Sequence, residues 1–280
     1  MIRVNRLFTI LSVLLCLGGC ATSPIFLSRG TAAGETAREN GFKKTLIPVR
    51  NFTLLSYIRI KETGKPLVIY IEGDGVAWES RSRISSDPTP SDPLVIRLAA
   101  LDPSPNVAYL ARPGQYPSLG ASQCDPKYWT GSRFSQEVIE DMDIAVSRLR
   151  ETAQAPSVSL IGYSGGAAVA VLVSAGRDDV TGLRTIAGNL DHEAVSKWNK
   201  VSPLKGSLDP IDVAAKIKSL PQRHFVAYND RIVPVSAAES FAAKIGDGKH
   251  GSITIVKGTT HHSGWEDKWP NLLDIPLYGQ

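Results

Sequence analysis

The stretch SVSLIGYSGGAAVAVLVSAG, residues Ser157–Gly176, places one serine between glycines where an apolar run meets an alanine-rich segment. The apolar run that ends at Ile161 has the length and β-branched content of a buried strand, and the segment from Gly165 favours a helix. In the Gly-x-Ser-x-Gly turn between them, small residues allow the strand and the helix to pack closely around an exposed serine. This pattern makes Ser164 a candidate nucleophile, and a plain strand-to-helix connection is the alternative.

The chain from residue 43 onward alternates apolar runs with amphipathic segments. An antiparallel strand pair is expected first, at residues 45–49 and 52–60. Asp92 is expected to cap the first helix, with Pro93 in its first turn. This alternation predicts an α/β fold, in which a mostly parallel sheet of about eight strands is flanked by helices. The further strands are expected at 66–71, 106–111, 157–162, 182–188, 223–228 and 251–256, and the helices at 92–101, 135–153, 165–175, 210–220 and 235–246.

A second glycine-containing turn follows the predicted strand that ends at Ile71 and reads Glu72-Gly73-Asp74-Gly75. Ligands of open α/β sheets bind beyond the carboxyl ends of the strands, so this turn and the serine turn are expected to lie together. Acyl transfer needs two N–H groups directed at the developing oxyanion. By analogy, the backbone N–H of Gly165 is the first expected donor and that of Asp74 the second. A tight loop without a catalytic role is the alternative.

The order of elements, the serine turn and the glycine turn resemble the α/β-hydrolase fold over residues 43–280. The resemblance implies a serine, acid and histidine in that order along the chain. The segment RHFVAYNDRIVPV supplies Asp230 after a late strand, and ITIVKGTTHHSGW supplies His261 after the last one. The resemblance therefore implies Ser164, Asp230 and His261 as the catalytic residues.

Alternatives to this assignment remain open in the sequence. His262 is the second candidate for the base, although His261 has the family's spacing of three residues from Gly258. Asp191 and Asp209 are alternative acids, because some members of the family carry the acid after an earlier strand. The remaining histidines lie at helix or strand starts and are expected to be structural: His192, His224 and His250.

Two long loops, Val76–Asp92 and Pro113–Arg133, are expected to border the substrate. Glu72 and Asp74 bring negative charge to the oxyanion region, so their side chains are expected to point away or to be held by an arginine such as Arg81 or Arg83. These arginines either meet an anionic group of the substrate or pair with Asp87 and Asp92. The aromatic residues of the loops are candidate pocket walls, whereas Trp265 and Trp269 are expected in the core: the candidates are Trp78, Tyr116, Tyr128 and Trp129.

The first twenty residues are typical of a targeting signal. Two arginines precede an apolar stretch, Leu7–Leu17, that is too short to span a bilayer. The following Leu17-Gly18-Gly19-Cys20 resembles the lipobox of bacterial lipoproteins, which implies cleavage before Cys20 and lipidation of its side chain and amino group. We therefore expect a signal peptide at 1–19, a flexible tether at 20–40 and a hydrolase domain at 41–280. Ordinary secretion with cleavage elsewhere and an uncleaved anchor are the alternatives.

Composition excludes several classes of function. Of the 280 residues, 42% are hydrophobic and 21% are charged, as in ordinary globular proteins. Loss of the signal's two arginines lowers the formal charge from +4 to +2, and no basic cluster suggests a nucleic-acid partner. Only Cys124 would remain unmodified after processing, so no intrachain disulfide is expected and no neighbouring cation activates that thiol.

Together these observations predict an envelope-anchored serine hydrolase that acts on a small-molecule or lipid-like carboxylic ester through an acyl-enzyme. No metal or cofactor is implied. Ala21 after the lipidated cysteine favours the periplasmic face of the outer membrane by resemblance. A peptidase, thioesterase or acyltransferase would use the same residues. From a different class, the alternative is a lipid-anchored binding or scaffold protein on a catalytically silent hydrolase fold. The oligomeric state stays open.

Overall fold

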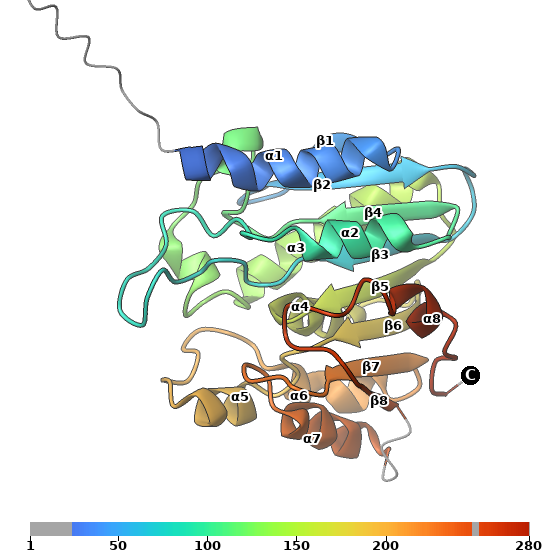
Figure 1. The fold of residues 1–280 in the computed structure, drawn as a ribbon. Helices are drawn as coiled ribbons and strands as arrows, with labels where there is room; N and C mark the ends of the chain where they lie inside the picture. Colours follow the sequence, from blue (N-terminus) through green and yellow to red (C-terminus); the bar gives the residue numbers. More distant parts are fainter. Residues whose placement is uncertain (1–23, 248–251, 280) are drawn as a thin grey trace, which may run out of the picture.

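The computed structural model describes residues 24–247 and 252–279 (Figure 1). One eight-stranded sheet runs through it in the order β1-β2-β4-β3-β5-β6-β7-β8. The strands β1 and β2 pair antiparallel, as expected, and β2 also pairs antiparallel with β4, whereas every other pairing is parallel. The strands are β1 (Lys43–Pro48), β2 (Thr53–Ile60), β3 (Leu67–Ile71), β4 (Asn106–Leu110), β5 (Val158–Tyr163), β6 (Val180–Ile186), β7 (Gln222–Ala227) and β8 (Ile253–Val256).

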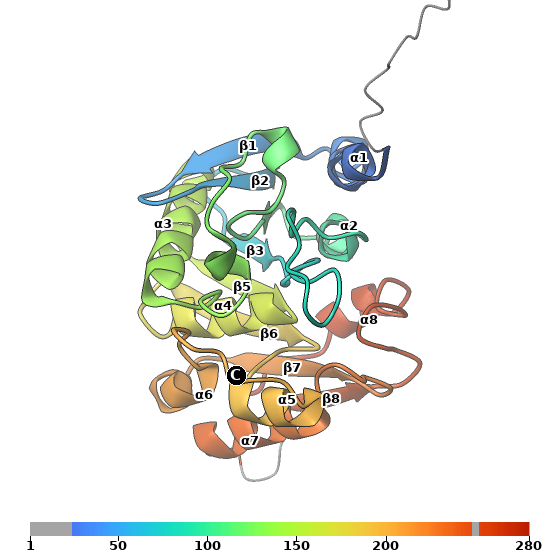
Figure 2. The same cartoon turned by 90° about the vertical axis from the view of Figure 1, so that its left-hand side faces the viewer.

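Helices cover both faces of this sheet, as Figure 2 shows. On one face α1, α2 and α8 lie side by side, and on the other α3, α4, α6 and α7 are in contact. The predicted α/β class, with a mostly parallel sheet of eight strands, is confirmed. The helices are α1 (Pro24–Glu39), α2 (Leu94–Leu101), α3 (Gln136–Ala153), α4 (Gly165–Ser174), α5 (His192–Asn199), α6 (Pro210–Val213), α7 (Val235–Ile245) and α8 (Trp269–Leu273), with 3₁₀ turns at η1 (Pro117–Leu119), η2 (Pro126–Trp129) and η3 (Ala214–Ile217).

The two faces of the sheet bury separate apolar clusters. One cluster packs β-strand residues against α3, α4 and α7, with Met142, Val169 and Phe241 at its centre. The other packs the opposite face against α1, α2 and α8 and includes Trp265 and Trp269, both fully buried as expected. β5 lies between β3 and β6 in the sheet, and α4 packs against it. The neighbouring strands and the helix therefore fix the position of the turn between β5 and α4.

The structure corrects the expected tether at residues 20–40. Pro24–Glu39 is a helix, α1, and its Ala33 and Ala37 are buried. Small residues recur along one side of α1 at helical spacing, so this helix approaches its neighbours closely. Side chains added at Gly30 and Gly34 would meet Leu119 and the Tyr57 hydroxyl at 3.2 and 3.4 Å.

Two predicted helices differ in detail. The helix expected at 92–101 begins at Leu94, and Pro93 rather than Asp92 occupies the cap position, without a side-chain hydrogen bond. Asp92 instead pairs with Arg97. The helix expected at 210–220 is divided into α6 and the 3₁₀ turn η3.

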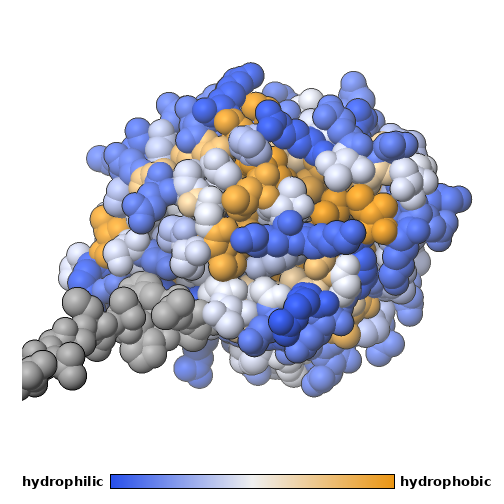
Figure 3. Space-filling model, turned by 90° about the horizontal axis from the view of Figure 1, so that it is seen from above, coloured by the Kyte–Doolittle hydropathy of each residue, from blue (hydrophilic) through white to orange (hydrophobic). Residues whose placement is uncertain are grey.

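The predicted signal peptide, the lipobox and Cys20 lie outside the described residues, as does His250. Among the helices that are described, none has the length and apolar content needed to cross a bilayer. Seen from above, the molecule shows hydrophobic side chains in separate patches between hydrophilic ones (Figure 3).

Candidate active site

Ser164 occupies a sharp turn between β5 and α4. Its backbone dihedrals, φ 52° and ψ −117°, are unfavourable for a residue with a side chain, so the surrounding packing must hold them. Gly162 and Gly166 are required because other backbone atoms come too close for a side chain at these positions. A Cβ at Gly162 would overlap the carbonyl oxygen of Gly166, and a Cβ at Gly166 would overlap that of Ile71. The sequence therefore folds here into a strained turn that presents the serine hydroxyl.

His261 joins this hydroxyl to a carboxylate. The His261 Nε2 atom lies 3.0 Å from Ser164 Oγ, and its Nδ1 atom lies 2.8 Å from Asp230 Oδ2. Both residues lie after strands at the carboxyl edge of the sheet, His261 after β8 and Asp230 after β7. The structure thus brings together the three residues that the sequence singled out, in a continuous hydrogen-bonded chain.

The turn after β7 fixes the Asp230 carboxylate. Its Oδ1 atom accepts hydrogen bonds from the N–H groups of Ile232 and Val233, at 2.8 and 2.9 Å. Burial alone would raise the pKa of Asp230, but the hydrogen bond and charge of His261 and these two N–H groups hold that pKa below its ordinary value. The carboxylate is therefore ionised at neutral pH and able to orient the imidazole.

The alternative residues have other partners. His262 is exposed, and its Nδ1 atom lies 2.9 Å from the hydroxyl of Tyr163, which donates to the carbonyl oxygen of His261 at 3.0 Å. Asp191 caps α5 and accepts from the Ser240 hydroxyl, and Asp209 accepts from the backbone N–H of His192. Within the described residues, none of these three alternatives has a hydrogen bond to Ser164 or His261.

The glycine turn after β3 lies directly against the serine turn. A Cβ at Gly73 would lie 3.3 Å from Ser164 Cβ, and a Cβ at Gly165 would overlap the Asp74 carboxylate. No acceptor in the described part of the chain pairs with the backbone N–H of Asp74 or of Gly165. The two residues expected to donate to the oxyanion, Gly165 and Asp74, therefore lie against each other beside Ser164.

The negative charges beside this turn are compensated, but not by the arginines that the sequence suggested. Arg112 Nη1 and Arg133 Nε lie 3.5 and 3.3 Å from the two Asp74 carboxylate oxygens. Arg83 instead pairs with Glu79 at the surface. Sequence reasoning missed Arg112 and Arg133 because they follow β4 and end a long loop, and only the fold brings them to Asp74.

Unlike Asp74, the Glu72 side chain is buried, and it forms no ion pair with these arginines. Its carboxylate accepts hydrogen bonds from the Gly73 N–H and the Tyr109 hydroxyl, each at 2.9 Å. Burial raises the pKa of Glu72 to about 7, and these two hydrogen bonds only partly oppose the shift. Its side chain points into this network and away from the serine.

Solved structures share this architecture at low sequence identity. An esterase of Pyrococcus furiosus superposes with a TM-score of 0.59 and 12% identity, covering 84% of this chain and 90% of its own. The chain has the α/β-hydrolase fold. An acylaminoacyl peptidase of Pyrococcus horikoshii (0.57, 12%, 82% of this chain and 38% of its own) and a puromycin-hydrolyzing peptidase of Mycobacterium tuberculosis (0.57, 14%, 83% and 38%) are also similar. Neither a scan against models of protein families nor a search of curated proteins finds a match.

The two long loops of this α/β-hydrolase fold are packed against each other. The Trp129 indole N–H donates to the Ser85 carbonyl at 3.2 Å, and Tyr116 is buried with its hydroxyl 3.0 Å from that of Tyr109. Tyr128 packs edge-on against Phe52. These three aromatic residues therefore stabilise the loops, whereas Trp78 is 44% exposed.

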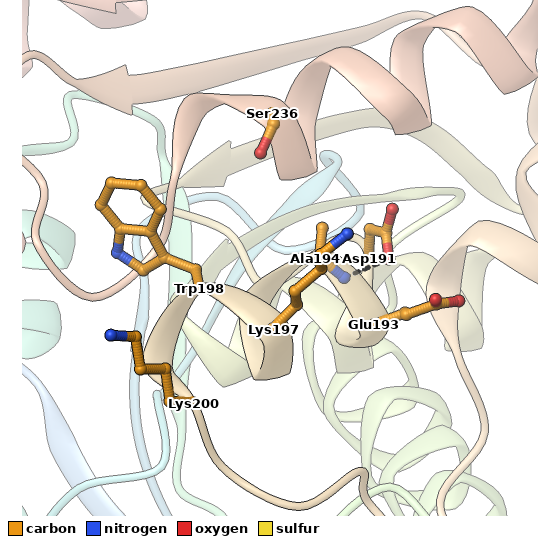
Figure 4. A pocket seen from close by; sticks show the side chains of 7 residues that line it. All are labelled: Asp191, Glu193, Ala194, Lys197, Trp198, Lys200 and Ser236. Atoms are coloured by element: carbon orange, nitrogen blue, oxygen red, sulfur yellow. Dashed lines mark hydrogen bonds between the residues drawn. The ribbon is translucent and has the colours of Figure 1, made fainter.

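A groove of about 700 Å³ lies beside α5, bordered by α7 (Figure 4). Ser164 does not line it. The Trp198 indole N–H donates to the Arg231 carbonyl at 3.1 Å, so the groove reaches the turn that carries Asp230. The groove is lined by Asp191, Glu193, Ala194, Lys197, Trp198, Lys200 and Ser236.

No group of three His, Cys, Asp or Glu side chains suited to a metal ion occurs in the described ranges.

Proposed function

We propose that this protein is a serine hydrolase that cleaves carboxylic esters through an acyl-enzyme. The observation that carries the proposal is the hydrogen-bonded chain from the Ser164 hydroxyl through His261 to Asp230, with contacts of 3.0 and 2.8 Å. The strained turn at Ser164 adds support, because such backbone strain concentrates at functional sites.

In the proposed reaction, Ser164 Oγ attacks the ester carbonyl while His261 Nε2 takes the hydroxyl proton. Asp230 keeps the imidazole in the required tautomer and stabilises the imidazolium. The N–H groups of Gly165 and Asp74 donate to the oxyanion of the tetrahedral intermediate. His261 then returns the proton to the leaving alcohol, and a water molecule that is activated in the same way releases the acid and the free serine.

Esters are the first candidate class of substrate, and peptides are the second. Both classes are represented among the similar structures, which include an esterase and two peptidases. Resonance with nitrogen stabilises an amide carbonyl against attack and an ester carbonyl much less, so activated esters are the most sensitive substrates for a first test.

The test uses the full chain with p-nitrophenyl esters of increasing acyl length and with N-acyl p-nitroanilides. We expect ester hydrolysis, and loss of at least about a thousandfold in kcat on Ser164→Ala, because the remaining binding groups alone catalyse weakly. Ser174→Ala is the matched control, since this hydroxyl lies in the same helix and donates only to the Ala170 carbonyl. Equal ester hydrolysis by the Ser164 variant would overturn the proposal, and faster anilide cleavage would favour the peptidase.

We further propose that the enzyme is anchored at the cell envelope through a lipidated Cys20, at the periplasmic face of the outer membrane. The support is the lipobox-like sequence that precedes this cysteine. A lipid-like ester taken from the bilayer would suit this position. In support, Arg29 of α1 contacts the first long loop, which is expected to border the substrate.

A further inference from the structure

We propose that Gln115 is a positioning residue that directs the backbone N–H of Asp74 at the oxyanion. This inference rests on the proposed serine hydrolase function and adds to it a side chain that does not touch the reacting atoms. Gln115 lies in the long loop after β4, and its side chain reaches across to the glycine turn after β3.

The peptide unit between Gly73 and Asp74 is the group that Gln115 contacts. Its carbonyl oxygen, that of Gly73, accepts a hydrogen bond from Gln115 Nε2 at 2.9 Å. A trans peptide unit is planar, and its C=O and N–H groups point in opposite directions. A donor that fixes the carbonyl therefore also fixes the direction of the Asp74 N–H.

Gln115 is itself held in one orientation. It is 1% exposed, and its Oε1 atom accepts from the Arg112 backbone N–H at 2.9 Å. Turning the amide over would place Oε1 against the Gly73 carbonyl and Nε2 against an N–H, so neither hydrogen bond would survive. The amide therefore presents its donor to Gly73 only.

The packing around the turn allows little adjustment. A Cβ at Gly75 would overlap the Pro88 carbonyl and lie 3.0 Å from Gln115 Nε2, and its φ of 61° favours glycine. Gln115 thus fills the space beside the turn as well as donating to it. Loss of its donor would leave the Gly73 carbonyl buried without that partner.

The Asp74 side chain provides a second constraint on the same residue. Its carboxylate lies against Gly165 between Arg112 and Arg133, whose guanidinium groups stack near the ring of Phe134 at 5.0 and 5.5 Å. Arg112 also donates through Nη2 to the Arg133 carbonyl at 2.5 Å. Burial lowers the pKa of Arg112 to about 10, which still leaves it protonated at neutral pH.

Arg112 therefore acts on Asp74 by two routes. Its backbone N–H orients Gln115, and Gln115 orients the N–H of Asp74, while its guanidinium compensates the charge of the Asp74 carboxylate. A substrate whose carbonyl oxygen becomes negatively charged then meets an N–H donor that needs no reorganisation.

The experiment compares Gln115→Met, which removes the donor, and Gln115→Glu, which keeps the shape. Active sites are titrated to completion with a fluorophosphonate, so that every rate is given per competent site. Two quantities are then measured: kcat and KM for a p-nitrophenyl ester, and the inhibition constant of a trifluoromethyl ketone, which forms a tetrahedral oxyanion on the serine.

We expect kcat per site to fall about 10- to 1,000-fold, the range for loss of one oxyanion donor, with KM changed less than about threefold. The ketone should bind more weakly by the factor by which kcat/KM falls, because only the tetrahedral state uses the N–H. A purely structural role would lower the number of titrated sites and the melting temperature without this parallel loss.

Gln222→Met is the matched control. Gln222 is 1% exposed, and its Nε2 also donates to backbone carbonyls, those of Ile217 and Leu220, but it begins β7 at the edge of the sheet opposite the site. This variant should lose stability and keep kcat per site. Gln115 variants that keep kcat per site and ketone affinity within threefold would overturn the inference. A wild-type chain that takes up no fluorophosphonate would overturn the proposed function instead.

Discussion

Two adjacent histidines of this α/β-hydrolase fold have different partners. His261 lies between Ser164 Oγ and Asp230, whereas the hydroxyl of Tyr163 holds His262. The two rings are in edge-to-face contact, with centroids 4.7 Å apart, but they hydrogen-bond to different residues. The spacing from Gly258 pointed to His261 as the base, and of the two histidines it is His261 whose ring nitrogen lies 3.0 Å from Ser164 Oγ.

The first prediction concerns these two residues. His261→Gln should lower the acylation rate at least about a thousandfold at every pH, because no other side chain takes the serine proton. His262→Gln should keep most of the activity, since its hydrogen bond is to Tyr163. Stopped-flow release of p-nitrophenol from pH 5 to 9 measures both. The opposite order of effects would transfer the base to His262.

The second prediction concerns the buried Glu72, whose pKa is raised by burial to about 7 from an ordinary 4.5. Between pH 4.5 and 7 the unfolded chain loses this proton while the folded chain keeps it, so the free energy of unfolding falls as pH rises. At about 1.4 kcal/mol per pKa unit, the total loss is roughly 3–4 kcal/mol.

Glu72→Gln should remove this loss. Urea unfolding at pH 5 and pH 8 measures the change in the free energy of unfolding for the variant and for the wild type. The difference between these two changes removes the contribution of the buried His192 and His224, whose lowered pKa values act in the opposite direction. The control is Glu151→Gln, which alters an exposed carboxylate on α3. If the variant and the wild type show the same difference between the two pH values, Glu72 does not titrate in this range.

Among the secondary-structure elements, the strands and the helices that follow a recognisable strand were predicted well, and α1 was not. β3 and β5 are short, mostly apolar segments and appear within one residue of the expected bounds. α1 buries Ala33 and Ala37 beside Gly30 and Gly34, and none of these residues produces an apolar stripe in the sequence. Its packing depends on neighbours that only the fold supplies.

The third prediction tests the docking of α1. Ala33→Asp should destabilise the fold by on the order of 3 kcal/mol, because it buries a carboxylate without a partner. This corresponds to a fall in melting temperature of about 10 °C for a chain of this size. Ala32→Asp on the same helix, at a partly exposed position, should cost much less. Equal melting temperatures for the two variants would show that α1 is not packed as described.

The whole molecule assembles its site from segments far apart in the chain. Ser164, Asp230 and His261 were identified in the sequence because each follows a recognisable strand. Arg112 and Gln115 were not, because their contacts with the glycine turn are side-chain contacts across the sheet edge. Patterns local to a strand or helix carry no information about such contacts.

The first turns of α1 also contact a loop at this edge. α1 starts four residues after Cys20, and Arg29 Nη1 lies 3.4 and 3.5 Å from the carbonyl oxygens of Asp87 and Thr89 in the first long loop. If Cys20 carries the proposed lipid, the anchor precedes α1 by four residues, and α1 contacts the loop that borders the proposed active site.

The fourth prediction follows from this arrangement. Cys20→Ser should release the protein from membranes or block its processing, because a lipid chain is what would bind it there. Hydrolysis of a soluble short-chain ester per titrated site should stay unchanged, and hydrolysis of long-chain esters in vesicles should fall. Intact mass spectrometry of the membrane fraction is the measurement, and a wild-type protein without a lipid adduct on Cys20 would refute the anchor.

The proposed function depends on activation of Ser164 as a nucleophile. The most direct measurement is fluorophosphonate labelling of the native chain followed by sequencing of the tryptic peptide Glu151–Arg177 by mass spectrometry. We expect one phosphonyl group per chain, on Ser164, and none in heat-denatured protein or after His261→Gln. Native protein that takes up no label, or labelling on another residue at the same rate in the Ser164→Ala variant, would contradict this expectation.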